Sequence, residues 1–111
     1  METYKTGEAP LLLNGATATG AGESLKLPLT YSKYSWRVNP VGSITAMTVV
    51  LQGSLDGEIW DNLDSNNNVA GGLRSVVDIP IKYVRANVTV WTPSGSGSPS
   101  AAVSVRLCPS L

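Results

Sequence analysis

The side chains best suited to chemistry in this chain are the carboxylates of its central region, Asp56, Asp61, Asp64 and Asp78. Asp56 precedes Gly57, and oxygen ligands spaced closely around a glycine turn are what a Ca²⁺ ion requires. The spacing does not follow that of an EF-hand loop. We therefore expect no metal: Asp56 belongs to a turn, and Asp61 and Asp64 are solvated at the end of a strand.

Other catalytic arrangements lack the residues that they need. The 111-residue chain has no histidine and one cysteine, Cys108, so a His-based triad, the usual zinc sites and a disulfide framework are excluded by count. Two carboxylates in a cleft can hydrolyse a glycosidic bond, but nothing places a pair of them together here. Ser94, Ser96, Ser98 and Ser100 occupy a low-complexity stretch without a nearby base. We expect no enzymatic activity and no cofactor.

Aromatic side chains are the remaining candidates for contact with a sugar or a protein. Six of them have this potential: Trp36, Trp60, Trp91, Tyr31, Tyr34 and Tyr83. We expect Trp60 to pack in the core behind the Asp56-Gly57 turn. Trp91 alternates with apolar residues and shares a strand face with Arg85, so we expect it to be partly exposed and available for contact. Arg85 itself is expected to pair with a carboxylate or a carbonyl group within the fold.

The balance of charges argues against two classes of partner. Eight Lys and Arg residues offset eight Asp and Glu residues, so the net charge is zero. A nucleic-acid binder that works by counterion release needs a basic face, and a membrane-surface protein needs a polybasic segment. We expect neither nucleic acid nor membrane as a partner.

The pattern of apolar residues predicts an all-β domain. Only 14% of residues are charged, and Val and Thr, which suit pleated strands, are common. Short apolar or alternating runs predict seven to eight strands, at residues 11–13, 24–29, 34–38, 44–52, 58–63, 74–79, 83–92 and 101–107. This spacing is typical of a single β-sandwich or jelly roll of antiparallel strands. We assign residues 11–111 to this domain and residues 1–10 to an N-terminal arm.

Local signals predict how these strands are connected. Asp56-Gly57 predicts a two-residue type I′ hairpin turn. Residues 39–42 are expected to form a turn, residues 64–72 a polar loop and residues 93–100 a flexible tip. Pro80 is expected to end one strand. In the strand at residues 83–92, Val84, Ala86, Val88 and Val90 are expected to face the core.

Two segments carry a resemblance to known domains. Residues 51–60 contain Ser-x-Asp-Gly-x-x-Trp, and residues 83–85 read Tyr-Val-Arg. This pair resembles motifs of discoidin-like jelly rolls, also described as coagulation factor 5/8 C-like domains. The resemblance implies a sandwich whose loops bind carbohydrate or lipid. The chain is shorter than those modules and lacks the paired terminal cysteines that many of them carry.

A second resemblance covers most of residues 11–107. Residues 14–22, the hairpin at 53–57, the strand at 83–88 and the terminal Val-x-Val-x-Leu look like those of small virion proteins of tailed bacteriophages. This resemblance implies a capsid decoration (cement) protein, or a tail, fibre or baseplate component, made in the cytoplasm of the host bacterium. Its expected partners are the major capsid protein or other virion proteins and further copies of itself.

Two function hypotheses follow from these resemblances. The first is a homo-oligomeric decoration protein that stabilises the assembled head, with contact residues Tyr4, Leu11, Leu12, Leu13 and Trp91. The arm would reach a neighbour and add a strand to an exposed sheet edge. The alternative is a carbohydrate-binding module. It requires that at least one of four aromatic residues be exposed beside polar loops: Trp36, Trp91, Tyr31 or Tyr34.

Overall fold

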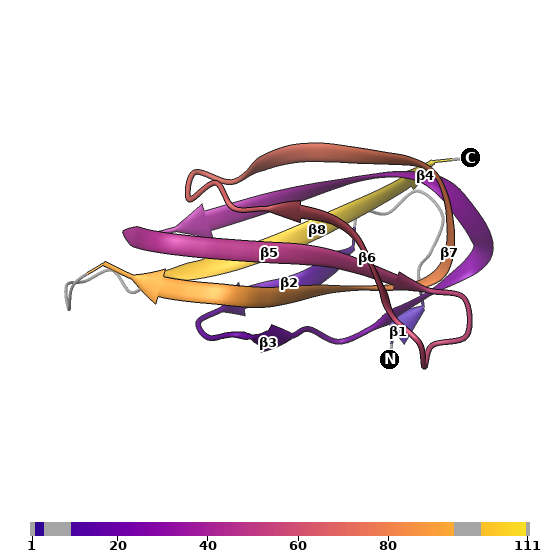
Figure 1. Cartoon of the computed structure of the whole chain (residues 1–111), viewed down its shortest axis with the longest axis horizontal. Coiled ribbons are helices and arrows are strands. Elements are labelled where there is room, and N and C mark those ends of the chain that lie inside the picture. The colour runs from indigo at the N-terminus through magenta and orange to yellow at the C-terminus, as the bar shows by residue number, and fades with distance from the viewer. Residues whose placement is uncertain (1, 4–9, 95–100, 111) are drawn as a thin grey trace.

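The strands of the protein form one continuous sheet that folds over on itself into a β-sandwich (Figure 1). The structure is a computed structural model that describes residues 2–3, 10–94 and 101–110. Its elements are β1 (Glu2–Thr3), β2 (Leu11–Ala16), β3 (Gly20–Ala21), β4 (Leu25–Val41), β5 (Ile44–Ser54), β6 (Asp61–Asn66), β7 (Gly72–Pro93) and β8 (Ala102–Ser110). The strand order is β2-β8-β4-β7-β5-β6, with β1 beside β4 and β3 beside β7. The predicted all-β sandwich is confirmed.

Pairing is antiparallel throughout the sheet except between β1 and β4, which are parallel. Tyr4 and most of the predicted arm and tip lie outside the described residues. The boundary between arm and domain stays a prediction.

Strands β4 and β7 each pass through both layers of the sandwich. In the first layer, residues 31–41 of β4 lie between β8 and residues 72–77 of β7. In the second layer, residues 83–93 of β7 pair with β5, which pairs with β6. Figure 1 shows both long strands curving round the same end of the molecule.

The corner between the layers explains why two predicted strand ends are absent. The predicted strands at 24–29 and 34–38 merge into β4, and those at 74–79 and 83–92 merge into β7. The prediction that Pro80 ends a strand was wrong. Pro28 and Pro80 lie where the β4–β7 register shifts, and Asp78 has a φ of 63° there. A bend of this kind leaves ladder positions unpaired, so it tolerates residues without an N–H.

The predicted turns are also longer or later than expected. β4 runs to Val41, so residues 39–41 are strand, and Gly42, with a φ of 80°, makes the turn into β5. The predicted two-residue turn at Asp56-Gly57 was wrong. A type I′ turn needs positive φ at both residues, and only Gly57 has it, at 81°. Gly53 pairs with Asp61 instead, so β6 begins later and runs through Asn66 into the predicted polar loop.

The core lies between the two layers and is built mainly from alternate residues of the long strands. The buried apolar residues are Leu12, Leu13, Leu25, Leu27, Tyr31, Tyr34, Trp36, Val38, Met47, Val49, Leu51, Val76, Ile81, Val84, Ala86, Val88, Val103, Val105 and Leu107. The predicted alternation is confirmed from Val84 to Val88 and fails at Val90, which is 41% exposed. Thr48 pairs with Val90 and Val49 with Val88, so Thr89 is an extra residue in β7. This bulge turns Val90 outward and Trp91 inward against the core.

Gly71 ties the loop before β7 to the end of β4. The residue is buried and has a φ of 77°, and its N–H donates to the Asn68 carbonyl at 2.8 Å. A Cβ atom at this position would collide with the carbonyl oxygen of Val38 and with the ring of Pro40. Only glycine therefore satisfies both the backbone conformation and the close approach.

We expect Gly71→Ala to destabilise the fold much more than Gly15→Ala. Gly15 also has positive φ, at 69°, but a Cβ there meets nothing within 4 Å. Gly15→Ala should lower the free energy of unfolding by about 1 kcal/mol through backbone strain alone, and Gly71→Ala by about 2 kcal/mol more through the collision. Urea denaturation measures both values. Equal losses in the two variants would contradict the close approach of Gly71 to β4.

Candidate functional site

The loop between β5 and β6, residues 55–60, is held in a defined conformation by two side chains. We call it the Trp60 loop. The Ser54 Oγ accepts hydrogen bonds from the N–H groups of Asp56 (3.2 Å) and Gly57 (2.8 Å). The Asp56 Oδ1 accepts from the Ser54 hydroxyl (2.9 Å) and from the N–H groups of Glu58 (2.9 Å) and Ile59 (3.0 Å). Such side-chain bonds compete with a tight hairpin, which explains the longer loop.

The same bonds set the electrostatics of Asp56. The N–H groups of Ile59 and Glu58, followed by the Ser54 hydroxyl, hold the pKa of this carboxyl group below its usual value. Asp56 thus lies in the connection between two strands, as expected, but in a longer loop in place of the predicted two-residue turn. Its oxygen atoms serve the loop backbone, and among the described residues no three acidic or cysteine side chains gather as a metal site.

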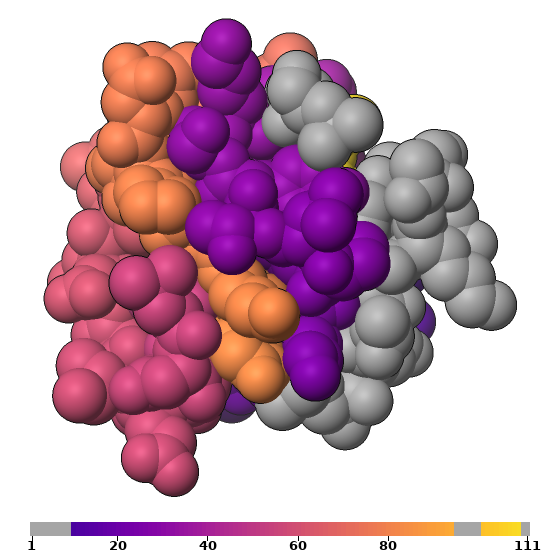
Figure 2. Space-filling model, turned by 90° about the vertical axis from the view of Figure 1, so that its right-hand side faces the viewer, coloured from indigo at the N-terminus to yellow at the C-terminus, as the bar shows by residue number. Residues whose placement is uncertain are grey.

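The Trp60 loop presents aliphatic side chains to solvent. Leu55 is 63% exposed and Ile59 is 71% exposed. The loop projects from the end of the molecule that faces the viewer in Figure 2, as the pink segment at the lower left. Ser54 and Asp56 already order the backbone of this loop. Binding of a partner to these side chains would therefore cost little conformational entropy.

Trp60 lies at the base of this loop and not in the core. It is half-buried, and the guanidinium carbon of Arg85 lies 4.3 Å from the centre of its ring, a cation–π contact. The core prediction for Trp60 was wrong because β6 begins only after this residue. The Arg85 Nε donates to the Gln52 Oε1 at 2.8 Å, which confirms the expected carbonyl partner. Gly57 lies against the ring of Tyr83, so Trp60, Tyr83 and Arg85 gather around one loop.

The aromatic residues expected to form a sugar platform are mostly buried. Trp36, Tyr31 and Tyr34 are 1%, 4% and 2% exposed. Of the four aromatic residues that the carbohydrate hypothesis named, Trp91 alone is partly exposed, as expected, and it packs partly against the core. Trp60 and Tyr83 are also half-buried, and they lie together beside one loop. The signal for them in the sequence was the Asp56-Gly57 loop beside the Tyr-Val-Arg strand.

The predicted contact strand at residues 11–13 is β2, the last strand at one end of the sheet order. Leu12 and Leu13 are 4% and 9% exposed and pack in the core of their own domain, whereas Leu11 is half-exposed. A depression of about 520 Å³ runs between β2 and residues 22–25. The interface hypothesis for β2 stays a prediction, in which Leu11 offers the accessible side chain.

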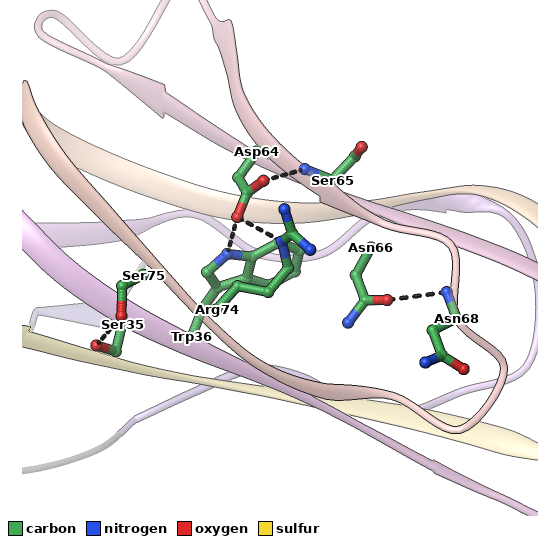
Figure 3. A network of polar contacts seen from close by, with 8 residues as sticks. All are labelled: Ser35, Trp36, Asp64, Ser65, Asn66, Asn68, Arg74 and Ser75. Atoms are coloured by element: carbon green, nitrogen blue, oxygen red, sulfur yellow. Dashed lines mark hydrogen bonds and ion pairs between the residues drawn. The ribbon is translucent and has the colours of Figure 1, made fainter.

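Asp64 links three strands by hydrogen bonds (Figure 3). Its Oδ2 accepts from the indole Nε1 of Trp36 in β4 at 2.9 Å and from the Nε of Arg74 in β7 at 2.8 Å. Its Oδ1 accepts from the N–H of Ser65 at 2.9 Å. The expectation that Asp64 is solvated at a strand end was wrong, because its side chain is only 15% exposed and fully occupied within the fold.

Burial and hydrogen bonding act in opposite directions on Asp64. Burial alone would raise the pKa of Asp64, but hydrogen bonds from Arg74, Trp36 and the Ser65 N–H outweigh it and hold the pKa below its usual value. Nearby, burial first and the charge of Asp64 second raise the pKa of the Tyr34 phenol to about 12. Asp64 is therefore ionised and Tyr34 neutral at neutral pH, which suits structural roles.

Comparison with solved structures shows the fold in two other proteins. The chain is similar to the SPBc2 prophage-derived protein YomS, with a TM-score of 0.64 and 12% identity over 93% of this chain and 92% of that one. It is also similar to CBM32-3 from a family 31 glycoside hydrolase of Clostridium perfringens, with a TM-score of 0.57 and 14% identity over 87% of this chain and 72% of that one. No family model and no curated protein matches the sequence. The TM-scores show a shared fold, and at identities this low they show the fold alone.

Within the described residues, no helix is long and apolar enough to cross a membrane.

We expect Asp64→Ala to lower the free energy of unfolding by about 2–3 kcal/mol, because it leaves the buried indole N–H of Trp36 without an acceptor and removes the ion pair. Asp61→Ala is the matched control, since Asp61 is an exposed carboxylate of the same strand; it should change stability by less than about 0.5 kcal/mol. Urea denaturation at pH 7 measures both.

The Asp64 carboxylate also predicts a dependence of stability on pH. Its pKa is lower in the folded state than the unfolded value of about 3.9, so its stabilisation is present above that pH and is lost as the pH falls through the folded pKa. When the pH is lowered from 7 to below about 4, the free energy of unfolding should therefore fall less for Asp64→Asn than for the wild type. Parallel acid profiles for the two proteins would contradict this assignment.

Proposed function

We propose that this chain is a non-enzymatic structural protein of a bacteriophage virion, and that it binds the outside of the assembled head as a decoration protein. The observation that supports this most is the similarity of fold to a prophage-derived protein over nearly the whole of both chains. A match of this extent means that an isolated sandwich of this size occurs among phage proteins. The carboxylates Asp56 and Asp64 are occupied by structural hydrogen bonds, which is in keeping with a role without catalysis.

The proposed mechanism is stabilisation by mass action. A protein that binds the assembled shell and not its dissociated subunits stabilises the shell by its binding free energy, and many copies multiply the effect. Contacts would come from the N-terminal arm with β2 and from the Trp60 loop, whose Leu55 and Ile59 are exposed on an ordered backbone. The partners in this proposal are the major capsid protein or another virion protein, and further copies of this chain.

Head binding tests the two contact regions separately. Purified heads that lack the protein are mixed with the wild type, with a chain lacking residues 1–10, and with Leu55→Ser/Ile59→Ser, and co-sedimentation measures the bound fraction. We expect both changes to weaken binding by about tenfold or more, because each removes apolar contact area. Val69→Ser is the control, since Val69 is 41% exposed in a different loop. If the wild type does not bind heads, the decoration role is wrong. If the chain lacking residues 1–10 binds as well as the wild type, the arm is not a contact.

A second candidate function is carbohydrate binding, as the name of the C. perfringens neighbour suggests. The arrangement that favours it is Trp60 with Arg85 across its ring and Tyr83 beside Gly57, at the end of the sandwich. Aromatic faces beside polar donors are suited to sugar rings.

Tryptophan fluorescence titration with glycans of the host surface tests this candidate. Sugar binding at the Trp60 loop should shift the emission of the wild type and of Trp91→Phe, but not that of Trp60→Phe. The two variants each remove one half-buried tryptophan, so they are matched. An unchanged spectrum with every glycan would count against the carbohydrate function and leave head binding as the proposal.

A further inference from the structure

An asparagine–glycine pair interrupts the pairing of β2 with β8. The Cα partners on either side of it are Leu13 with Val105 and Ala16 with Val103. Asn14 and Gly15 of β2 therefore lie opposite a single residue of β8, Ser104, which is the count of a β-bulge. The φ of Gly15 is 69°, a conformation that glycine adopts readily.

An asparagine followed by glycine can react within its own backbone. The backbone nitrogen of the glycine attacks the side-chain Cγ of the asparagine, so that an N–Cγ bond forms and closes a five-membered succinimide ring. The amide nitrogen leaves as ammonia and takes up the proton of the attacking N–H. Water then opens the ring at either carbonyl, which yields aspartate or isoaspartate. A Cβ on the following residue hinders the attack, and glycine has none.

The position of the pair in the fold leaves room for this reaction. Asn14 and Gly15 are both exposed. A Cβ built on Gly15 would meet nothing within 4 Å, so the space beside this residue is open. The extra residue of a bulge stands outside the regular ladder, and its backbone can therefore rearrange at a smaller cost in strand pairing than that of an ordinary ladder residue.

One hydrogen bond opposes the reaction. The N–H of Gly15 donates to the Oγ of Ser104 at 3.0 Å. The nitrogen must release this acceptor before it can lose its proton and approach the side chain of Asn14. Ser104 therefore holds the attacking nitrogen in an unreactive arrangement, and the cost of breaking this bond adds to the barrier.

We propose that Asn14 is a site of spontaneous deamidation in the folded protein, and that Ser104 slows the conversion by holding the Gly15 N–H. The product would place a carboxylate in a groove of about 450 Å³ that Asn14 lines together with Leu11 and Arg37. It would also give the formally neutral chain one net negative charge.

A change of charge in this groove would alter a surface that the proposed function uses, since Leu11 is one of its contact residues. This consequence alone rests on the proposed function. The reaction itself requires only the chain and water.

Peptide mass spectrometry tests the proposal on the full-length protein. The wild type, Ser104→Ala and Ser104→Thr are kept folded at neutral pH, sampled over days and digested with trypsin. The tryptic peptide of residues 6–26 contains Asn14 as its only amide side chain, so the mass difference between amide and acid reports this site alone. We expect the acid form to accumulate in the wild type and about fivefold faster in Ser104→Ala, because one neutral hydrogen bond is lost. Ser104→Thr keeps the hydroxyl group and should keep the wild-type rate.

Asn67 is a matched internal control. It is exposed like Asn14, and the N–H that follows it, that of Asn68, also donates to a side-chain oxygen, the Asn66 Oδ1, at 2.9 Å. Asn68 carries a Cβ where Gly15 has none, so Asn67 should convert at least about tenfold more slowly than Asn14.

Three outcomes would overturn the proposal. The first is no conversion of Asn14 in the folded wild type although the same protein converts when it is unfolded in urea. The second is equal rates at Asn14 and Asn67. The third is a rate in Ser104→Ala that is no higher than in the wild type, which removes the role of Ser104. None of these measurements contains phage heads, so their failure leaves the decoration role standing, and failure of head binding leaves the deamidation site standing.

Discussion

The carboxylate of Asp64 is the interaction on which the arrangement of the two layers depends. Trp36 and Arg74 belong to the first layer, and Asp64 comes from β6, the last strand of the second. The indole N–H of Trp36 points out of the apolar core and needs an acceptor, because an unsatisfied buried donor is costly. Asp64 supplies this acceptor and Arg74 balances its charge. These bonds thereby link β6 of the second layer to β4 and β7 in the first.

The hydrogen bonds of Asp64 lie between the layers and do not involve the Trp60 loop or the outer face of the first layer. The Trp60 loop follows β5 and is ordered by its own side chains, Ser54 and Asp56, so its exposed Leu55 and Ile59 do not depend on the core for their conformation. On the outer face of the first layer, a shallow groove is lined by residues of β2, β4 and β8, among them Arg37 and Arg106. A small sandwich of this kind can therefore vary its loops and outer side chains without disturbing its packing.

Much of the fold followed from local patterns, but the site did so only in part. Alternation identified Tyr34, Trp36 and Val38 as one buried face, and Val103, Val105 and Leu107 as another. Turn chemistry located the Asp56-Gly57 loop but not its length, because Ser54 and Asp56 bind backbone N–H groups that a two-residue hairpin would pair differently. Trp60 was consequently placed in the core, and the surface that it forms with Arg85 was missed.

The sequence by itself determined the strand content, the apolar faces and the scarcity of catalytic groups, because these depend on residue types and on a period of two. Only the tertiary structure decided three further features. It merged strands through the corner at Pro28 and Pro80, and it turned Trp91 inward through the bulge at Thr89. It also brought Arg37 opposite Arg106, residues far apart in the chain. Register between distant strands arises from the packing of the whole sheet, so no local pattern contains it.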